Sequence, residues 1–266
     1  MMARAIQPVR LIKGLPGKAR PQLILFNDGC EYVVKFKNNR QGTRVLVNEY
    51  VVGRLAKLLN LPIVPFKVVS ISQKFIKANK RLARRRLKAG RQFASLYLDH
   101  CVPLSQARPP GRRQLRNADQ LKSLIAFDHW VNNTDRGRGN ILVDGYSRSR
   151  RVYIIDHANC FTNGFKWTKK SLKVIPQKTI KRRVHRWCAT LFKDRKTLLA
   201  SIKKIKAIRG SQIRKIIDSI PADWGVTAAE KHALYHHILQ SRKTLRKRLA
   251  VFVSSKTRKK SSWKPR

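Results

Sequence analysis

A hairpin signal near the N-terminus is the feature that most constrains the fold of this chain. Residues 22–37 read QLILFNDGCEYVVKFK, in which two apolar runs flank Asn-Asp-Gly at 27–29. An Asn-Gly or Asp-Gly pair supplies the positive φ of a tight turn between antiparallel strands. The second of these strands carries Lys35. The sequence therefore predicts an antiparallel sheet in the first part of the chain.

A helix and a further strand are expected to complete this first unit. Thr43 can cap a helix that runs to about residue 60 and contains Glu49, because apolar residues recur there at helical intervals. A strand follows at 66–72. After it, residues 73–92 form a basic amphipathic stretch without an acid. This stretch is either a surface for nucleic acid or ribosomes, or a solvated helix face.

The rest of the chain is expected to be mainly helical. Two prolines and a glycine in RPPGRRQLR, residues 108–116, break the pattern, so a lobe boundary is expected near 102–113. A helix over 119–131 and a capping box at Thr227 and Glu230 are also expected. The predicted organisation is an N-lobe at 1–105, a helical C-lobe at 106–253 and a disordered basic tail at 254–266.

The charge of the chain determines which partners its surface attracts. There are 61 Lys+Arg against 13 Asp+Glu, a net charge of +48, while 42% hydrophobic residues are enough for a core. Such a field attracts nucleic acid, ribosomes, nucleotides or an acidic membrane face and does not choose among them. The four cysteines lack the spacing of a zinc site or a disulfide framework. With no apolar run of membrane-span length and no signal peptide, a cytoplasmic protein is expected.

Acidic residues are so rare here that their placement carries information. Four of the thirteen fall within residues 128–156, where uniform scatter would place about 1.4. They are Asp128, Asp135, Asp144 and Asp156. Asp128 can bond loop amides or pair with Arg136, and Asp144 before a glycine indicates a turn.

Two short strands in this window are expected to bring two oxygen ligands together. If ILV at 141–143 pairs with VYII at 152–155 so that 141 faces 155, Asn140 lies opposite Asp156. Opposed residues lie about 4.5–5.5 Å apart, so an amide oxygen and a carboxylate can converge on one cation. Mg²⁺ is usually held by such oxygens together with water and phosphate.

Asp135 lies five residues before Asn140, in a loop within reach of the same point. There it can accept a hydroxyl proton or orient a nucleophile. The spacing Asp-x4-Asn, followed by strand, turn, strand and Asp, is the catalytic-loop and metal pattern of protein kinases, with TDRGRGN and IIDHA replacing HRDxxxxN and DFG. A kinase also needs a strand lysine and a helix glutamate that holds it, and Lys35 and Glu49 have this order.

Together these motifs resemble the HipA-like kinases, relatives of the phosphatidylinositol-kinase-like branch. The resemblance covers about residues 10–165, through GLPGKARPQLI, DGCEYVVKF, LVNEYVVGRLAKLLNLPIVP, GRQFASLYL, FDHWVNNTDRGRGN and VYIIDHANCF. It implies a two-lobed α+β protein-kinase-like fold with a small antiparallel N-lobe and a mainly helical C-lobe. It also implies ATP and Mg²⁺ as cofactors and transfer of the γ-phosphoryl group.

The resemblance also implies a role for each matching residue. Lys35 corresponds to the lysine on the ATP phosphates and Glu49 to its partner. Asp135 corresponds to the catalytic aspartate, and Asn140 and Asp156 to the metal ligands. In KGLPGKARPQ the nucleotide-covering residues are Gly14, Gly17 and Lys18, although Ala19 stands where a hydroxyl residue is expected. A simple Gly/Pro turn is the alternative for this segment.

Two functions follow from these patterns. The first is a kinase for a hydroxyl acceptor, for which the family resemblance favours Ser or Thr of a protein and the lipid-kinase-like form of the motifs leaves a small hydroxyl substrate open. The alternative is a non-catalytic kinase-fold module that binds nucleic acid or ribosomes through its basic surface. Arg136 and Arg138, on either side of Gly137, are expected to contact phosphate or to order the loop.

Overall fold

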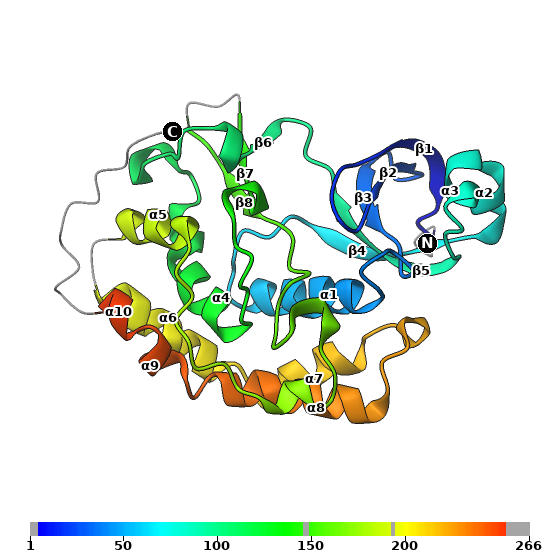
Figure 1. The fold of residues 1–266 in the computed structure, drawn as a ribbon. Coiled ribbons are helices and arrows are strands. Elements are labelled where there is room, and N and C mark those ends of the chain that lie inside the picture. The colour runs from blue at the N-terminus through cyan, green and yellow to red at the C-terminus, as the bar shows by residue number, and fades with distance from the viewer. Residues whose placement is uncertain (1–4, 146–148, 193–194, 254–266) are drawn as a thin grey trace.

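The predicted hairpin supplies two inner strands of a five-stranded sheet (Figure 1). The structure is a computed structural model that describes residues 5–145, 149–192 and 195–253. In the sheet order β1-β2-β3-β5-β4, the strands are β1 (Pro8–Gly14), β2 (Gln22–Phe26), β3 (Glu31–Lys35), β5 (Gly90–Leu96) and β4 (Phe66–Ile71). Gly29 has φ +74° in the turn between β2 and β3. All pairings in this sheet are antiparallel, so the predicted antiparallel sheet is confirmed.

Helices pack on both faces of this sheet. They are α1 (Arg44–Leu58) on one face and α2 (Gln73–Ala78) and α3 (Lys80–Arg84) on the other. Side chains alternate along β3, so Val34 packs with Leu82 of α3 while Lys35 points to Glu49 of α1. The basic stretch 73–92 therefore buries its apolar side on the sheet face that lies away from Lys35.

A second, three-stranded sheet has a register that differs from the predicted one. Its strands, in order, are β6 (Cys101–Pro103), β7 (Ile141–Asp144) and β8 (Val152–Ile154). Ile141 pairs with Ile154, so the predicted pairing of 141 with 155 is wrong by one residue. Opposed residues share a face, and the observed register buries Ile141 and Val143 with Val152 and Ile154. The predicted register would have brought the less buried Tyr153 and Ile155 to that face.

The remainder of the chain is mainly helical, as expected. Its helices are α4 (Leu124–Trp130), α5 (Arg183–Leu191), α6 (Arg195–Ala207), α7 (Gly210–Asp218), α8 (Ala228–Ser241), α9 (Leu245–Arg248) and α10 (Ala250–Val253). The single helix predicted over 119–131 is wrong in its first half, which is a 3-10 helix at Ala118–Ser123. The capping box of Thr227 and Glu230 at the start of α8 is confirmed. Thr43 precedes α1, but its hydroxyl donates to the carbonyl of Lys37 instead of capping the helix.

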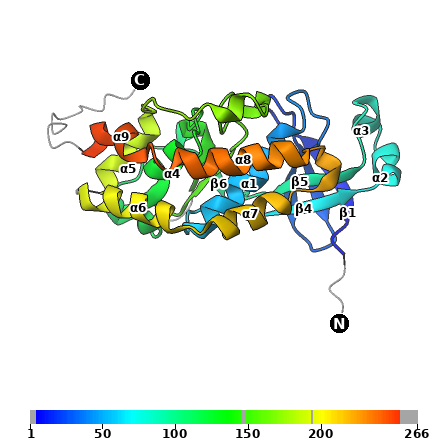
Figure 2. The ribbon, with the colours of Figure 1, turned by 90° about the horizontal axis from the view of Figure 1, so that it is seen from below.

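Helix α1 connects the two parts of the molecule. It packs against the first sheet and against α7, and α8 packs against α7 in turn (Figure 2). The larger apolar core runs from α1 through α4 to α8, and a smaller one lies between the first sheet and α2–α3. Within the described residues, no helix is long and apolar enough to cross a membrane. The predicted boundaries at 105 and 253 stay predictions, and the tail at 254–266 lies outside the described residues.

Candidate active site

Lys35 and Glu49 form a buried ion pair between β3 and α1. The Lys35 ammonium donates to Oε1 of Glu49, and the two side chains are 14% and 3% exposed. Glu49 is held from its other oxygen by the backbone N–H of His157, 3.0 Å from Oε2. The predicted strand lysine and helix glutamate are thus brought together.

The charges of this pair stabilise each other. Burial alone would lower the pKa of Lys35, but the carboxylates of Glu49 and Asp156 outweigh it and hold that pKa above its usual range. Burial alone would raise the pKa of Glu49, but the Lys35 ammonium and the side chain of His157 hold it well below its usual range. Lys35 is therefore a fixed cation and Glu49 a fixed anion at any physiological pH.

Asp156 brings a second carboxylate to the same ammonium. Its Oδ1 lies 3.2 Å from Nζ of Lys35, and its side chain is 43% exposed. Asp156 follows β8 and has φ +56°, a left-handed conformation that is uncommon for a residue other than glycine. The left-handed conformation thus occurs at the residue whose side chain contacts Lys35, which lies 121 positions earlier in the chain.

The predicted catalytic loop is held by hydrogen bonds between its own asparagine side chains and its backbone. Asp135 is exposed, and its backbone N–H donates to Oδ1 of Asn133 at 3.1 Å. Nδ2 of Asn140 donates to the carbonyl of Asp135 at 2.7 Å, which joins the two ends of the loop. The carbonyl of Asn140 accepts from the N–H of Ile155 at 3.1 Å, so Asn140 lies beside the residue that precedes Asp156.

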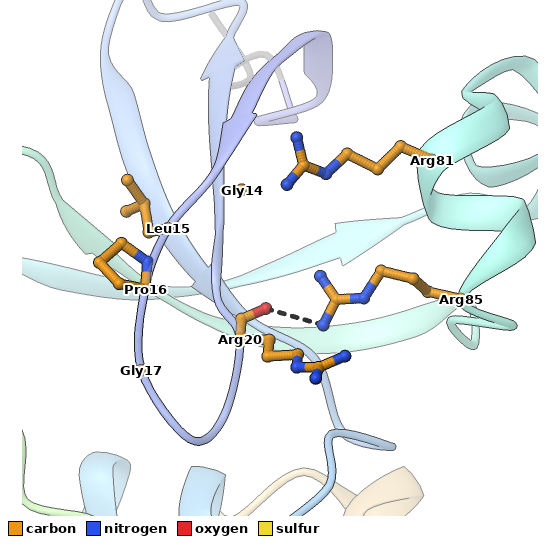
Figure 3. Close-up of a pocket in the computed structure, with 7 residues that line it drawn as sticks. All are labelled: Gly14, Leu15, Pro16, Gly17, Arg20, Arg81 and Arg85. Carbon is orange, nitrogen blue, oxygen red and sulfur yellow. Dashed lines mark hydrogen bonds between the residues drawn. The ribbon is translucent and has the colours of Figure 1, made fainter.

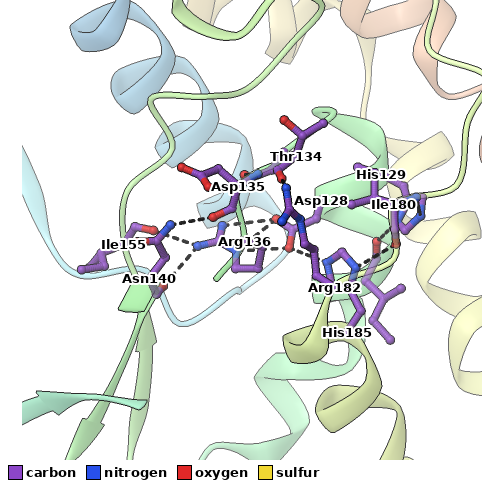
Figure 4. Close-up of polar contacts among 12 residues, drawn as sticks. Asp128, His129, Thr134, Asp135, Arg136, Asn140, Ile155, Ile180, Arg182 and His185 are labelled. Atoms are coloured by element: carbon purple, nitrogen blue, oxygen red, sulfur yellow. Dashed lines mark hydrogen bonds and ion pairs between the residues drawn. The ribbon is translucent and has the colours of Figure 1, made fainter. Parts of the chain in front are cut away.

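A buried charge network lies beside this loop (Figure 4). Asp128 on α4 accepts from Nε of Arg136 at 3.1 Å and lies 3.0 Å from Nε2 of His185, and all three side chains are fully buried. Burial alone would raise the pKa of Asp128, but Arg136 and His185 lower it to about 2. The predicted pairing of Asp128 with Arg136 is confirmed.

Both loop arginines, Arg136 and Arg138, donate hydrogen bonds to backbone carbonyls. Nη1 of Arg136 donates to the carbonyls of Asn140 at 3.2 Å and Ile155 at 2.8 Å, and so ties the loop to the end of β8 (Figure 4). Arg138 donates to the carbonyls of Leu104 and Ala107. Of the two roles expected for these arginines, ordering of the loop is the one that their contacts support.

Three residues that support the loop were missed from the sequence. His185 lies 57 positions from its partner Asp128, Arg182 donates to the carbonyl of Thr134, and the buried Arg248 donates to Oδ1 of Asn132 at 2.9 Å. They come from the helical part of the chain, where basic residues are common. No local spacing distinguishes them from their neighbours.

Asn140 and Asp156 have the oxygen atoms that a divalent cation needs. Hydrogen bonds occupy Nδ2 of Asn140 and Oδ1 of Asp156. Oδ1 of Asn140 and Oδ2 of Asp156 make no hydrogen bond with any residue that the structure describes. One amide oxygen and one carboxylate oxygen, open to water and phosphate, fit the preference of Mg²⁺.

The predicted nucleotide-covering loop follows β1. Gly17 has φ +121°, which requires glycine, and Lys18 is exposed. Gly14 and Gly17 line a cavity together with three arginines, and neither Lys35 nor Asp156 is part of its lining. The loop residues thus line a cavity that does not include the ion pair, and their nucleotide role stays a prediction.

Comparison with protein families places this arrangement among kinases. The family model described as HipA-like kinase matches residues 11–255. No curated protein matches the sequence.

Solved structures with the same fold are also kinases. The Helicobacter pylori proinflammatory kinase CtkA aligns over 93% of this chain and 96% of its own, with TM-score 0.60 and 15% identity. HipA of Shewanella oneidensis MR-1, solved with HipB and operator DNA, aligns over 94% and 73% with TM-score 0.52 and 12% identity. A Golgi casein kinase solved with Mn/ADP aligns over 94% and 74% with TM-score 0.51 and 10% identity. These likenesses show the two-lobed kinase fold.

Proposed function

Since the chain belongs to the HipA-like kinase family, we propose that it uses ATP and Mg²⁺ to transfer the γ-phosphoryl group to a hydroxyl acceptor. One observation carries this proposal. Residues far apart in sequence, Lys35, Glu49 and Asp156, meet in one polar cluster with the order and element types of a kinase phosphate site.

Lys35 is the proposed ligand of the α- and β-phosphates. An ammonium has three N–H donors, and Glu49 and Asp156 accept two of them. The third donor is left for a phosphate oxygen. Glu49, buried and held by His157, keeps the ammonium in place when the nucleotide enters.

Asn140 and Asp156 are the proposed ligands of Mg²⁺ through the two oxygens that the protein leaves without a hydrogen bond. When bound there, the metal would neutralise charge that develops on the phosphate oxygens during transfer. Arg136 fixes the separation of these ligands, because it binds the carbonyls of Asn140 and Ile155 at once.

Asp135 is the proposed catalytic aspartate. Its carboxylate would accept the proton of the acceptor hydroxyl while the hydroxyl oxygen bonds to the γ-phosphorus. The bond between that phosphorus and the β–γ bridging oxygen breaks, and ADP leaves with the electron pair. Because Asp135 is exposed, a large acceptor can reach its carboxylate, which favours Ser or Thr of a protein over a small molecule.

The test is phosphoryl transfer from γ-labelled ATP with Mg²⁺, to the protein itself or to proteins of a cell lysate. Asp135→Asn should lower the rate by roughly 10²–10⁴-fold, because it removes the proton acceptor and keeps the side-chain shape. Asp99→Asn is the matched control, since this aspartate is 86% exposed and its ion pair is with the adjacent His100. A rate that falls equally in both variants would contradict the role of Asp135.

The net charge of +48 supports a second candidate, a kinase-fold module that binds nucleic acid or ribosomes without catalysis. Silence of wild type and Asp135→Asn alike in the transfer assay, with RNA binding that weakens steeply as salt rises, would favour this candidate. Label transfer by wild type alone would favour the kinase.

A further inference from the structure

A cavity of about 350 Å³ lies between the loop after β1 and helix α3 (Figure 3). Its lining residues are Gly14, Leu15, Pro16, Gly17, Arg20, Arg81 and Arg85. It belongs to the side of the first sheet on which α2 and α3 pack, and Lys35 points to the opposite side. It is therefore distinct from the proposed catalytic cluster.

Three arginines from two elements converge on this cavity. Arg81 of α3 and Arg85, the residue just after α3, extend toward the loop, and Arg20 lies at the loop's end (Figure 3). Nη2 of Arg85 donates to the carbonyl of Arg20 at 3.2 Å, which fixes the position of one guanidinium. Arg81 lies so close to Gly14 that a Cβ at this glycine would be 2.3 Å from Nη2. Glycine at position 14 thus permits the approach of Arg81.

The charge of this cluster is not neutralised. No ion pair among the described residues involves Arg20, Arg81 or Arg85. Burial and the nearby guanidinium groups of Arg20, Arg81 and Arg40 lower the pKa of Arg85, so the cations repel one another. The hydrogen bond of Arg85 to the Arg20 carbonyl and the position of Arg81 beside Gly14 bring these like charges to one cavity.

We propose that this cavity binds a small polyphosphate, such as the diphosphate group of a phosphorylated metabolite, at a site separate from the catalytic cluster. Guanidinium groups pair with phosphate through charge-assisted and often bidentate hydrogen bonds. The cavity is in the size range of small-molecule sites. No aromatic side chain is among its lining residues, so a nucleic-acid base would find no stacking surface there.

The test is isothermal titration of pyrophosphate, in EDTA, into wild type and three variants. Arg81→Gln/Arg85→Gln removes two charges from the cavity. Lys74→Gln/Lys77→Gln is the matched control, because it removes two charges from exposed positions of α2 that do not line the cavity. Lys35→Gln weakens the catalytic cluster and leaves the cavity intact.

The double arginine variant should bind pyrophosphate at least roughly tenfold more weakly, because two charge-assisted donors are lost. The lysine control should bind within about twofold of wild type and Lys35→Gln should retain the site, since neither changes a charge-assisted donor of the cavity. Equal weakening in the arginine and lysine variants would overturn the proposal, as would a loss confined to Lys35→Gln. It would also be overturned if a 20-nucleotide single-stranded RNA, and not pyrophosphate, were the ligand whose binding needs Arg81 and Arg85. Since no catalysis is measured, failure of the proposed kinase function would leave this result unchanged.

Discussion

Replacement of Asp128 tests whether the buried charge network stabilises the fold around the loop that carries Asp135. Its pKa is lowered to about 2 because Arg136 and His185 outweigh burial. A carboxylate with a lowered pKa stabilises the fold above its unfolded value of 3.8, and that stability is lost as pH falls through about 2. The shift corresponds to roughly 2 to 3 kcal/mol at pH 7. Asp128→Asn also leaves Arg136 buried without its counter-charge, so the expected loss of unfolding free energy is about 3 to 5 kcal/mol.

Urea unfolding at pH 7 measures this loss directly. Asp119→Asn is the control, because Asp119 is 68% exposed and its ion pairs with Arg112 and Lys122 lie at the surface. That change should alter the unfolding free energy by at most about 1 kcal/mol. The reasoning would be refuted if the unfolding free energy of Asp128→Asn lay within about 1 kcal/mol of that of the Asp119→Asn control. It would mean that Arg136 finds other anionic partners.

Two further predictions concern stability. His129 and His237 have pKa values lowered to about 3 and about 4, mainly by burial, so the unfolded chain takes up protons below pH 6.5 that the folded chain does not. The unfolding free energy should therefore fall by about 2 to 4 kcal/mol between pH 7 and pH 5, and a flat profile of urea midpoints would contradict the neutral state of these histidines. Gly53→Ala should destabilise the fold by about 1 kcal/mol despite the better helix propensity of alanine, since its Cβ would meet the Phe66 ring, which stacks on Phe93. The ring atoms lie 2.6 and 2.7 Å from that Cβ. A thermal midpoint equal to or above that of wild type would show that the ring can move.

Local patterns explain why much of the fold could be predicted from the sequence. The Asn-Asp-Gly turn requires a positive φ, and the structure has it at Gly29. The capping box at Thr227 and Glu230 also depends on neighbours in sequence. The predicted register of β7 and β8 was wrong by one residue, because the register depends on which side chains enter the core. Burial of Ile141 with Ile154 is a tertiary property that strand signals alone do not contain.

The candidate site shows the same division between local and distant determinants. The order of Lys35, Glu49 and Asp156 could be read because a kinase needs fixed residue types on fixed elements. The contacts of Arg136 with two carbonyls depend on backbone positions that a sequence does not reveal. The contact of Arg81 with the loop after β1 could not be predicted, because Arg81 lies in the basic stretch 73–92 and many lysines and arginines of that stretch face solvent. In such a basic chain, charge becomes informative only when side chains converge.

The rate of γ-phosphoryl transfer in Glu49→Gln tests the central claim most directly, namely that Lys35 is held by Glu49 for use on ATP. Glu31→Gln is the matched control, because Glu31 makes no ion pair among the described residues and lies on the same strand as Lys35. Loss of the anion should misplace the Lys35 ammonium and lower the rate by about 10²-fold, with Glu31→Gln close to wild type. Transfer by Glu49→Gln at the wild-type rate, with circular dichroism unchanged, would contradict the account.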